Sequence, residues 1–184
     1  MGKLRVYNFV TLNGYFKGAD DDISWAKNGS KEEQEFAGEN AKSDGILLFG
    51  RKTYEMMAGY WPTENAKKNN AAVAEGMNNA EKIVISTSLK KADWSNTRIV
   101  KDDLEKEIKK LKQSGKDITI LGSGTIVTQL AEAGLIDEYQ IMIYPVVIEN
   151  GTSLLKEIHK DLELKLIDNR VFKSGAVFLH YAKR

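Results

Sequence analysis

The sequence predicts an α/β protein with a mostly parallel, helix-covered sheet that ends in antiparallel edge strands, and three observations support this prediction. Short apolar strands alternate with helical patterns through most of the chain, which is the order of parallel β–α–β units. Residues 46–49 (Ile-Leu-Leu-Phe) form a strand that is apolar on both faces, as in the middle of a parallel sheet. The last third carries strand and turn signals in succession, which is typical of antiparallel pairing.

The first unit begins with a strand at residues 4–12, which is rich in Val, Tyr, Phe and Leu. A long loop with two glycines and three consecutive aspartates follows and ends near Trp25. Ser30 and Glu33 have the spacing of a capping box, so a helix is expected from this point to about Ser43. The apolar strand described above then completes the unit.

A second helix is predicted to begin at the segment Gly50 to Thr53, directly after that strand. Residues 65–79 are polar, and we expect a mobile stretch there rather than regular structure. Further strands are predicted at residues 82–86 and, shorter, at residues 98–100, because both segments are rich in β-branched residues.

The next helix is predicted to have Asp102 as its cap, paired with Glu105, and apolar residues recur after it at helical spacing. A strand at residues 117–121 leads through a glycine-rich turn into another helix. Gly134 followed by Leu135 is the pattern of a Schellman motif and should end that helix.

The C-terminal third is predicted to be β-rich. A strand at residues 139–144 precedes a turn at Asn150-Gly151, and apolar residues alternate with charged ones through residues 162–166. Lys173-Ser174-Gly175 separates that strand from a last one at residues 176–181. These strands should form the antiparallel edge of the sheet.

Composition places the chain among ordinary globular proteins and excludes several functions. Its 184 residues suit a single domain that spans residues 1–184. A net charge of +1 provides no field for nucleic acid or an anionic membrane. The absence of cysteine excludes thiol nucleophiles, iron–sulfur clusters and cysteine-ligated zinc, and the two histidines are too few for a metal site. No apolar run is long enough to span a membrane and the N-terminal residues lack a signal-peptide core, so a cytoplasmic location is expected.

Two strand-to-helix junctions have the composition of phosphate sites. Residues 47–53 (LLFGRKT) and 118–125 (ITILGSGT) each place glycine and a hydroxyl at a helix N-terminus, where free backbone N–H groups attract anions. Ser86-Thr87-Ser88 follows a third strand, and ligands of open parallel sheets bind outside the carboxyl ends of the strands. Three such loops fit a dinucleotide, and Arg51 could receive a ribose 2′-phosphate, which favours NADP over NAD.

An ordered set of motifs resembles the dihydrofolate-reductase-like superfamily, which implies a three-layer α/β/α fold. The motifs are Val10 to Tyr15, Trp25, Leu48 to Glu55, Ile83 to Ser88, and Leu121 to Gly124. The first of them, together with Gly134 to Glu138 and Pro145 to Val147, is most similar to the riboflavin-biosynthesis branch. That branch comprises the C-terminal domain of the bacterial bifunctional deaminase–reductase and its stand-alone relatives.

The resemblance implies NADPH as cofactor and a role for each motif. The adenosine side of NADPH would be held by the first and third loops, the pyrophosphate by the glycine turn, and a mobile lid would cover the nicotinamide and the substrate. The implied cofactor residues are Gly50, Arg51, Lys52, Thr53, Ser86, Thr87, Gly122, Ser123, Gly124 and Thr125, and the implied lid residues are Leu12, Asn13, Gly14, Tyr15 and Trp25.

The proton-donating group is the weaker part of this prediction. Folate reductases use one carboxylate on the first helix, and here the candidates are Glu33 and Glu35, although counting back from Gly50 places the family position near Gln34. The usual Ser-Leu-Asp-Gly of the riboflavin branch has Asn13 in place of its aspartate. A glutamate on such a helix can equally belong to a solvated face.

The resemblance therefore implies an NADPH-dependent reductase similar to 5-amino-6-(5-phosphoribosylamino)uracil reductase, which acts on a small heterocyclic or ribosylamino-pyrimidine substrate. No deaminase zinc motif is present in the sequence. A dihydrofolate reductase and a non-catalytic NADP-binding or interaction protein on the same fold are the alternatives. The apolar C-terminal strands would leave an open sheet edge, so a homodimer is also expected.

Overall fold

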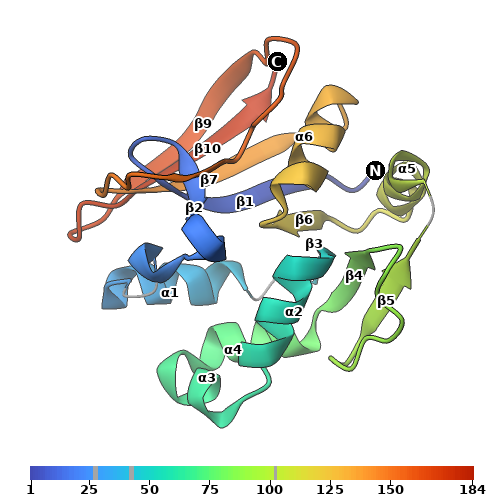
Figure 1. The fold of residues 1–184 in the computed structure, drawn as a ribbon, viewed down its shortest axis with the longest axis horizontal. Helices are drawn as coiled ribbons and strands as arrows, with labels where there is room; N and C mark the ends of the chain where they lie inside the picture. Colours follow the sequence, from blue (N-terminus) through green and yellow to red (C-terminus); the bar gives the residue numbers. More distant parts are fainter. Residues whose placement is uncertain (27–28, 42–43, 102) are drawn as a thin grey trace.

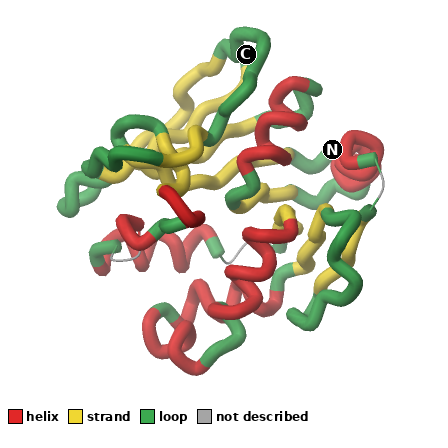
Figure 2. The backbone as a smooth tube through the Cα atoms, in the orientation of Figure 1, coloured by secondary structure: helices red, strands yellow, loops and turns green. Residues whose placement is uncertain are grey.

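The computed structural model describes residues 1–26, 29–41, 44–101 and 103–184 and contains one large and one small sheet (Figures 1 and 2). Eight strands form the large sheet in the order β5-β4-β3-β6-β1-β7-β10-β9, and β2 pairs with β8 in the small one. The large sheet consists of β1 (Leu4–Thr11), β3 (Ile46–Gly50), β4 (Glu81–Ile85), β5 (Thr97–Val100), β6 (Ile118–Leu121), β7 (Glu138–Tyr144), β9 (Leu164–Val171) and β10 (Val177–Lys183). The small sheet consists of β2 (Tyr15–Gly18) and β8 (Gly151–Ser153).

Pairing within the large sheet is parallel from β5 to β7 and antiparallel at β10 and β9, as the sequence predicted. Residues Phe172 and Ala176 close the β9–β10 hairpin through a backbone hydrogen bond of 2.9 Å. Helices join most of the consecutive parallel strands, and a helix-free segment, residues 86–96, joins β4 to β5, because a parallel pair cannot be connected by a tight turn. The predicted change from parallel to antiparallel pairing in the C-terminal third is therefore confirmed.

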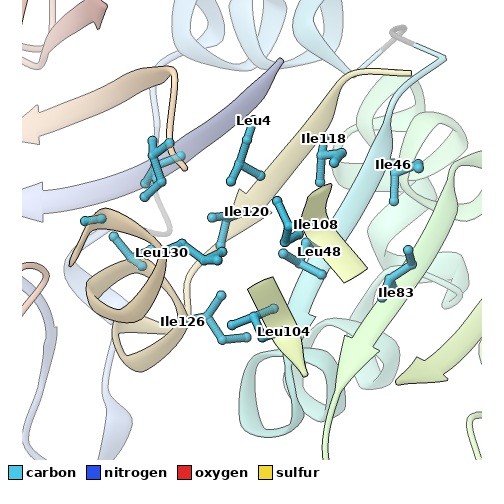
Figure 3. Packing of buried hydrophobic residues seen from close by; sticks show 14 of the residues in the cluster. Leu4, Ile46, Leu48, Ile83, Leu104, Ile108, Ile118, Ile120, Ile126 and Leu130 are labelled. Atoms are coloured by element: carbon cyan, nitrogen blue, oxygen red, sulfur yellow. The ribbon is translucent and has the colours of Figure 1, made fainter. Parts of the chain in front are cut away.

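Helices cover both faces of the large sheet and produce three layers. They are α1 (Lys31–Asn40), α2 (Arg51–Tyr60), α3 (Glu64–Asn69), α4 (Ala71–Asn79), α5 (Leu104–Gln113) and α6 (Gly124–Glu132), with short 3₁₀ turns η1 (Ala19–Asp21) and η2 (Ser24–Ala26). One core cluster joins α5 and α6 to the sheet, as Figure 3 shows for Leu104, Ile108, Ile126 and Leu130. A second joins α2 and α4 to Phe49 and Val84 on the opposite face.

Strand β3 shows why the middle of the sheet is apolar on both sides. Leu48 belongs to the cluster under α5 and α6, whereas its neighbour Phe49 belongs to the cluster under α2 and α4. Both side chains are fully buried. Successive side chains point to opposite faces of a strand, so a sheet covered on both faces needs this continuous apolar pattern.

The predicted helix ends are formed largely by the residues that the sequence indicated. Ser30 accepts the backbone N–H of Glu33, and the Glu33 carboxylate accepts that of Ser30, which makes a complete capping box for α1. Leu135 donates to the carbonyl of Leu130 at 3.0 Å, as in a Schellman motif. Asp102 lies outside the described residues, and the cap of α5 is Asp103.

The expectation of a mobile stretch at residues 65–79 was wrong. Two helices, α3 and α4, occupy it, and the side chains of Thr63 and Asn70 cap them. The buried side chains of Val73 and Met77 attach α4 to the core. Glu75 and Asn79 are exposed, whereas Asn78 is half-buried and accepts a hydrogen bond from Trp94 Nε1 at 2.7 Å, so the polar residues of this stretch belong partly to an exposed helix face and partly to its packing.

A lysine side chain from β4 binds the carbonyl groups at the C-terminal end of α4. Lys82, the second residue of β4, is fully buried, and its Nζ donates to the carbonyls of Met77, Asn78 and Ala80 at 2.8, 3.1 and 2.7 Å. The ammonium group also lies 4.6 Å from the ring centroid of Trp94. A cation at a helix C-terminus satisfies the free carbonyls and complements the helix dipole.

The long loop after β1 also contains more structure than predicted. Residues 15–18 form β2, which pairs with β8, so Gly151 begins a strand of the small sheet. The Asn150-Gly151 turn therefore leads into distant pairing and does not connect neighbouring strands of one hairpin. Among the described residues, no helix is long and apolar enough to cross a membrane.

Candidate active-site groove

A large groove of about 2660 Å³ runs along the sheet edge where β3, β4, β6 and β7 end. All ten proposed cofactor residues line it, as do Trp25 and Glu33. Of the other predicted residues, Leu12, Asn13, Gly14, Tyr15 and Glu35 do not. The topology thus brings the two glycine junctions and one of the two candidate carboxylates to a single surface.

The two glycine junctions touch each other because β3 and β6 are neighbours in the sheet. The N–H of Gly50 donates to Ser123 Oγ at 2.6 Å, and Thr53 Oγ1 lies 3.3 Å from the same oxygen. Gly122 has a φ of +63°, and a Cβ atom there would lie 2.9 Å from the side chain of Thr53. Only glycine accommodates both the backbone conformation and the close approach.

The helices that begin at these junctions have free N-terminal N–H groups. Gly50 and Ser123 are the N-cap residues of α2 and α6, and neither provides a side-chain cap. Each helix is long enough to carry a dipole, with ten residues in α2 and nine in α6. Two adjacent helix N-termini with uncapped donors are an arrangement that could hold an anion with more than one phosphate.

Basic side chains lie beside these donors, and each already has an acidic partner. Arg51 Nη1 is 3.2 Å from Glu55 one turn along α2, and Lys52 Nζ is 3.2 Å from Asp21 of η1. Lys17 binds the same Asp21, and hydrogen bonds from the two lysines lower the pKa of that carboxyl group. Both groove cations are largely exposed, so an arriving phosphate can compete for them.

In the loop after β4, one predicted cofactor residue holds the loop in shape and the other is accessible to a ligand. Ser86 is buried, and its Oγ accepts the backbone N–H groups of Ser88 and Leu89 at 3.2 and 2.9 Å. Thr87 is exposed and lines the groove. The Ser86 hydroxyl therefore shapes the loop, and Thr87 is the group that a ligand can reach.

The other end of the groove carries a buried carboxylate. Glu33 is 5% exposed, and Tyr144 Oη donates to its Oε2 at 3.0 Å. Burial by itself would raise the pKa of Glu33, but hydrogen bonds from Ser174, Ser30 and Tyr144 outweigh it and hold the pKa below its ordinary value. Glu33 is thus an anion held by neutral donors.

The remaining candidates on α1 lie in different surroundings. Glu35 is exposed and pairs with Lys31 at 3.7 Å, which is the arrangement of a solvated helix face. Gln34, the position obtained by counting back from Gly50, is exposed and donates to the carbonyl of Gly29. Of the two predicted carboxylates, the structure brings only Glu33 to the groove.

An aromatic cluster surrounds Glu33 and was missed by the sequence reasoning. The ring of Tyr144 lies 5.8 Å from Trp25 and 5.6 Å from Phe9, and Phe9 lies 5.6 Å from Tyr7. Burial and the nearby Glu33 charge raise the pKa of Tyr7 and Tyr144, so both hydroxyls remain donors. The alternation of Tyr7 and Phe9 in β1 was the one local signal; Tyr144 joins them only through the fold.

The predicted lid is in part a fixed structure. Asn13 accepts from Thr11 Oγ1 at 2.8 Å and donates to the carbonyl of Ile148 at 2.9 Å, so the residue in place of the family aspartate braces this turn. Besides Trp25, the side chain of Phe16 reaches the groove, and it lies against Gly124 so closely that a Cβ atom there would be 3.0 Å from the ring. Leu12 is 67% exposed and is not among the residues that line the groove.

The residues present fit a dinucleotide phosphate. Uncapped N–H groups at two helix ends suit the phosphates, and Gly122 leaves the space in which a backbone approaches a ligand closely. Two buried polar atoms, Asn8 Oδ1 and Trp25 Nε1, have no hydrogen-bond partner among the described residues, and both residues line the groove. Within the same described residues, no group of three potential ligands could hold a metal ion.

Comparison with known proteins identifies similar sequences and similar solved structures. YyaP of Bacillus subtilis (strain 168) is 28% identical over 94% of this chain and 90% of its own, and YwjB of the same organism is 26% identical over 98% of both; both are named as uncharacterized. Among solved structures, a protein of Shewanella sp. PV-4 that is named for riboflavin biosynthesis superimposes with a TM-score of 0.75 at 19% identity and covers 99% of both chains. RibD of Acinetobacter baumannii gives a TM-score of 0.70 at 16% identity over 100% of this chain and 58% of its own.

These solved structures share the fold with this chain. The RibD C-terminal domain model matches residues 3–178, which is nearly the whole length. The mostly parallel sheet with antiparallel C-terminal strands is the architecture of that dihydrofolate-reductase-like domain. The chain therefore belongs to the RibD C-terminal domain family.

Proposed function

We propose that this protein is an NADPH-dependent reductase that acts on a small heterocyclic or ribosylamino-pyrimidine substrate, as 5-amino-6-(5-phosphoribosylamino)uracil reductase does. The observation that carries the proposal is a single groove with two uncapped helix N-termini at one end and a buried carboxylate in an aromatic cluster at the other. Membership of the RibD C-terminal domain family supports it.

At the phosphate end, the helix N-termini that begin at Gly50 and Ser123 would bind the pyrophosphate through backbone N–H groups. Arg51 would exchange Glu55 for the ribose 2′-phosphate, since a guanidinium group binds a phosphate in bidentate fashion. Thr87 would bind a ribose or phosphate oxygen, whereas Ser86 would keep its structural role. Bound NADPH would supply a hydride to the electrophilic carbon of a C=N or C=O bond.

At the carboxylate end, Glu33 would bind N–H groups of a flat heterocycle between the aromatic rings. Its lowered pKa means that it is ionised at neutral pH, so it accepts hydrogen bonds and orients the substrate. The nitrogen or oxygen that receives the electron pair would then take its proton from a water held in the groove, while the raised pKa of Tyr144 keeps its hydroxyl protonated as a donor to Glu33. Phe16 and Trp25 would exclude bulk water from this end.

Two alternatives are tested by the same measurements. A buried carboxylate on the first helix also suits a dihydrofolate reductase, which would bind antifolates in the aromatic cluster. Asn13 in place of the family aspartate favours a non-catalytic NADP-binding or interaction protein, which would bind NADPH without turning it over.

We further propose a cytoplasmic homodimer formed at β9, where Leu166, Ile167 and Val171 are exposed.

The first test is calorimetric titration of the protein with NADPH and with NADH, repeated with Arg51→Ala. We expect NADPH to bind more tightly than NADH, and the variant to lose about 1.5–3 kcal/mol of NADPH binding free energy while NADH binding changes little. Lys31→Ala, an exposed cation on α1, serves as the matched control. A substrate screen then follows the loss of nicotinamide absorbance. Failure of the wild-type protein to bind either nucleotide would refute the reductase proposal.

A further inference from the structure

Asn8 interrupts an otherwise apolar row on β1. Leu4, Val6 and Val10 share one face of the strand, and all three are buried in the core cluster under α5 and α6. Asn8 has the same parity and is only 5% exposed. The face that α6 covers thus contains an amide where packing alone would select a branched apolar side chain.

The amide is incompletely satisfied. Its Oδ1 atom is buried and has no hydrogen-bond partner among the described residues, although Asn8 lines the groove. A buried acceptor without a donor destabilises a folded protein, and each such atom in a native structure needs an explanation. A ligand group that donates a hydrogen bond in the groove is the explanation that agrees with its position.

Register in the sheet locates Asn8 relative to the glycine turn. The last pair between β1 and β6 is Tyr7 with Leu121, so Asn8 is level with Gly122, where the chain leaves the sheet. On its other side Asn8 pairs with Ile141 of β7. The unpartnered amide therefore lies immediately beside the turn that begins α6.

Strand order then indicates which part of a dinucleotide reaches Asn8. Along the sheet edge, Thr87 follows β4, Arg51 follows β3, Gly122 follows β6, and Asn8 lies on β1. If the adenosine 2′-phosphate is at Arg51 and the pyrophosphate at Gly122, the next position along the edge belongs to the nicotinamide. The carboxamide –NH₂ of that ring is a donor that matches an unpartnered amide oxygen.

We propose that Asn8 is a specificity-determining residue whose Oδ1 accepts a hydrogen bond from the nicotinamide carboxamide. This inference rests on the proposed function, because it assumes that the groove binds NADPH. It assigns Asn8 to cofactor recognition, and it explains why the row of apolar residues on β1 is broken at this one position.

The test compares three ligands in the full-length protein and in Asn8→Leu. The ligands are NADPH, its reduced acetylpyridine analogue, in which a methyl group replaces the carboxamide –NH₂, and 2′-phospho-ADP-ribose, which lacks the nicotinamide. The wild type should bind NADPH about tenfold more tightly than the acetylpyridine analogue. Asn8→Leu should bind those two ligands with equal affinity and should bind 2′-phospho-ADP-ribose as the wild type does.

Thermal unfolding of the unliganded proteins provides a readout that is independent of activity. Asn8→Leu should unfold at the same or a higher temperature than the wild type, because the variant removes an unpaired buried acceptor. Val6→Leu, on the same face of β1, is the control for the effect of the larger side chain on packing. The wild-type comparison of NADPH with its analogue needs no variant and holds if Asn8→Leu fails to fold.

The outcomes separate this inference from the proposed function. Equal affinity of the wild type for NADPH and its analogue overturns the role of Asn8 alone, as does an equal loss of NADPH and 2′-phospho-ADP-ribose binding in Asn8→Leu. A wild-type protein that binds none of the three ligands overturns the proposed function and, with it, this inference.

Discussion

Buried glutamates meet both ends of strand β7, and their surroundings differ. Glu138, the first residue of the strand, is 4% exposed, forms ion pairs with Lys3 and Arg5, and lies within hydrogen-bond distance of His180. Glu33 contacts the last residue, Tyr144, and its hydrogen bonds come from neutral donors. The cations around Glu138 neutralise its negative charge. The negative charge of Glu33 has no such cationic partner and is therefore available to a ligand in the groove. Burial of a carboxylate therefore does not by itself indicate function; the charge of its partners does.

The pKa values express the same difference. Burial would raise the pKa of Glu138, but hydrogen bonds from Lys3, Arg5 and His180 lower it to about 2. The pKa of Glu33 is also lowered against the effect of burial, by uncharged groups. In both cases the folded state favours the ionised form, so each glutamate stabilises the protein above its ordinary pKa and ceases to do so as the pH falls.

Glu138→Gln should have the largest effect on stability. We expect a loss of about 2–3 kcal/mol in the free energy of unfolding at pH 7, because the variant leaves Lys3 and Arg5 without their anion. The difference from wild type should be full above pH 4.5 and should shrink as the pH falls toward 2. Urea unfolding at several pH values measures it.

The control for this variant is Glu81→Gln. Glu81 is also the first residue of a strand and pairs with a lysine, Lys116, but its side chain is 42% exposed. Its replacement should change the stability by less than about 0.5 kcal/mol. If Glu138→Gln lowered the free energy of unfolding as little as this control, the ion pairs of Glu138 would not stabilise the fold.

Tyr144→Phe should have an intermediate effect. Removal of the hydroxyl takes one donor from the buried Glu33 carboxylate, which should cost about 1–2 kcal/mol of stability. The pKa of Glu33 should rise toward its ordinary value, which a carbon-detected NMR titration of the carboxyl group would measure. Tyr139→Phe, on the same strand but packed in the core cluster under α5 and α6, is the control. An unchanged Glu33 titration in Tyr144→Phe would contradict the hydrogen bond.

Glu33→Gln should have the smallest effect on stability and the clearest effect on substrate. The amide oxygen can take the place of Oε1 and accept from Ser30, and the amide –NH₂ can donate to the hydroxyl oxygen of Tyr144, so we expect a loss of about 1 kcal/mol or less at pH 7. NADPH affinity should be unchanged while turnover of any substrate found by the screen falls. Glu35→Gln, on the same helix but exposed, should change neither quantity. Loss of NADPH binding in Glu33→Gln would place this carboxylate at the cofactor instead.

The two ends of the groove also differ in how far the sequence revealed them. The glycine turns could be predicted because a strand, a glycine and a hydroxyl at a helix start lie within a few consecutive residues, as in Gly122-Ser123-Gly124. The aromatic cluster could not, because Tyr7, Trp25 and Tyr144 are brought together by the pairing of β1 with β7 and by the loop after β2.

The fold was predicted where local signals and packing agree. The capping box at Ser30 and the apolar strand at residues 46–49 were correct because each depends on neighbouring residues. Helix α4 was missed because its docking depends on Val73 and Met77 reaching a core formed by other elements. Asn8 is the reverse case: its burial follows from strand parity, but its unsatisfied oxygen becomes apparent only when its surroundings are known.

The buried amine of Lys82 can be used to measure how often α4 separates from β4. Its amine is enclosed by three carbonyls and the Trp94 ring, and burial lowers its pKa to about 8. The amine loses this effect of burial once it is uncovered and then reacts with an amine-reactive reagent as exposed lysines do, whereas the closed state shields it from the reagent. Acylation of Lys82 therefore counts the moments when α4 separates from β4, and the exposed lysines set the reagent's reference rate.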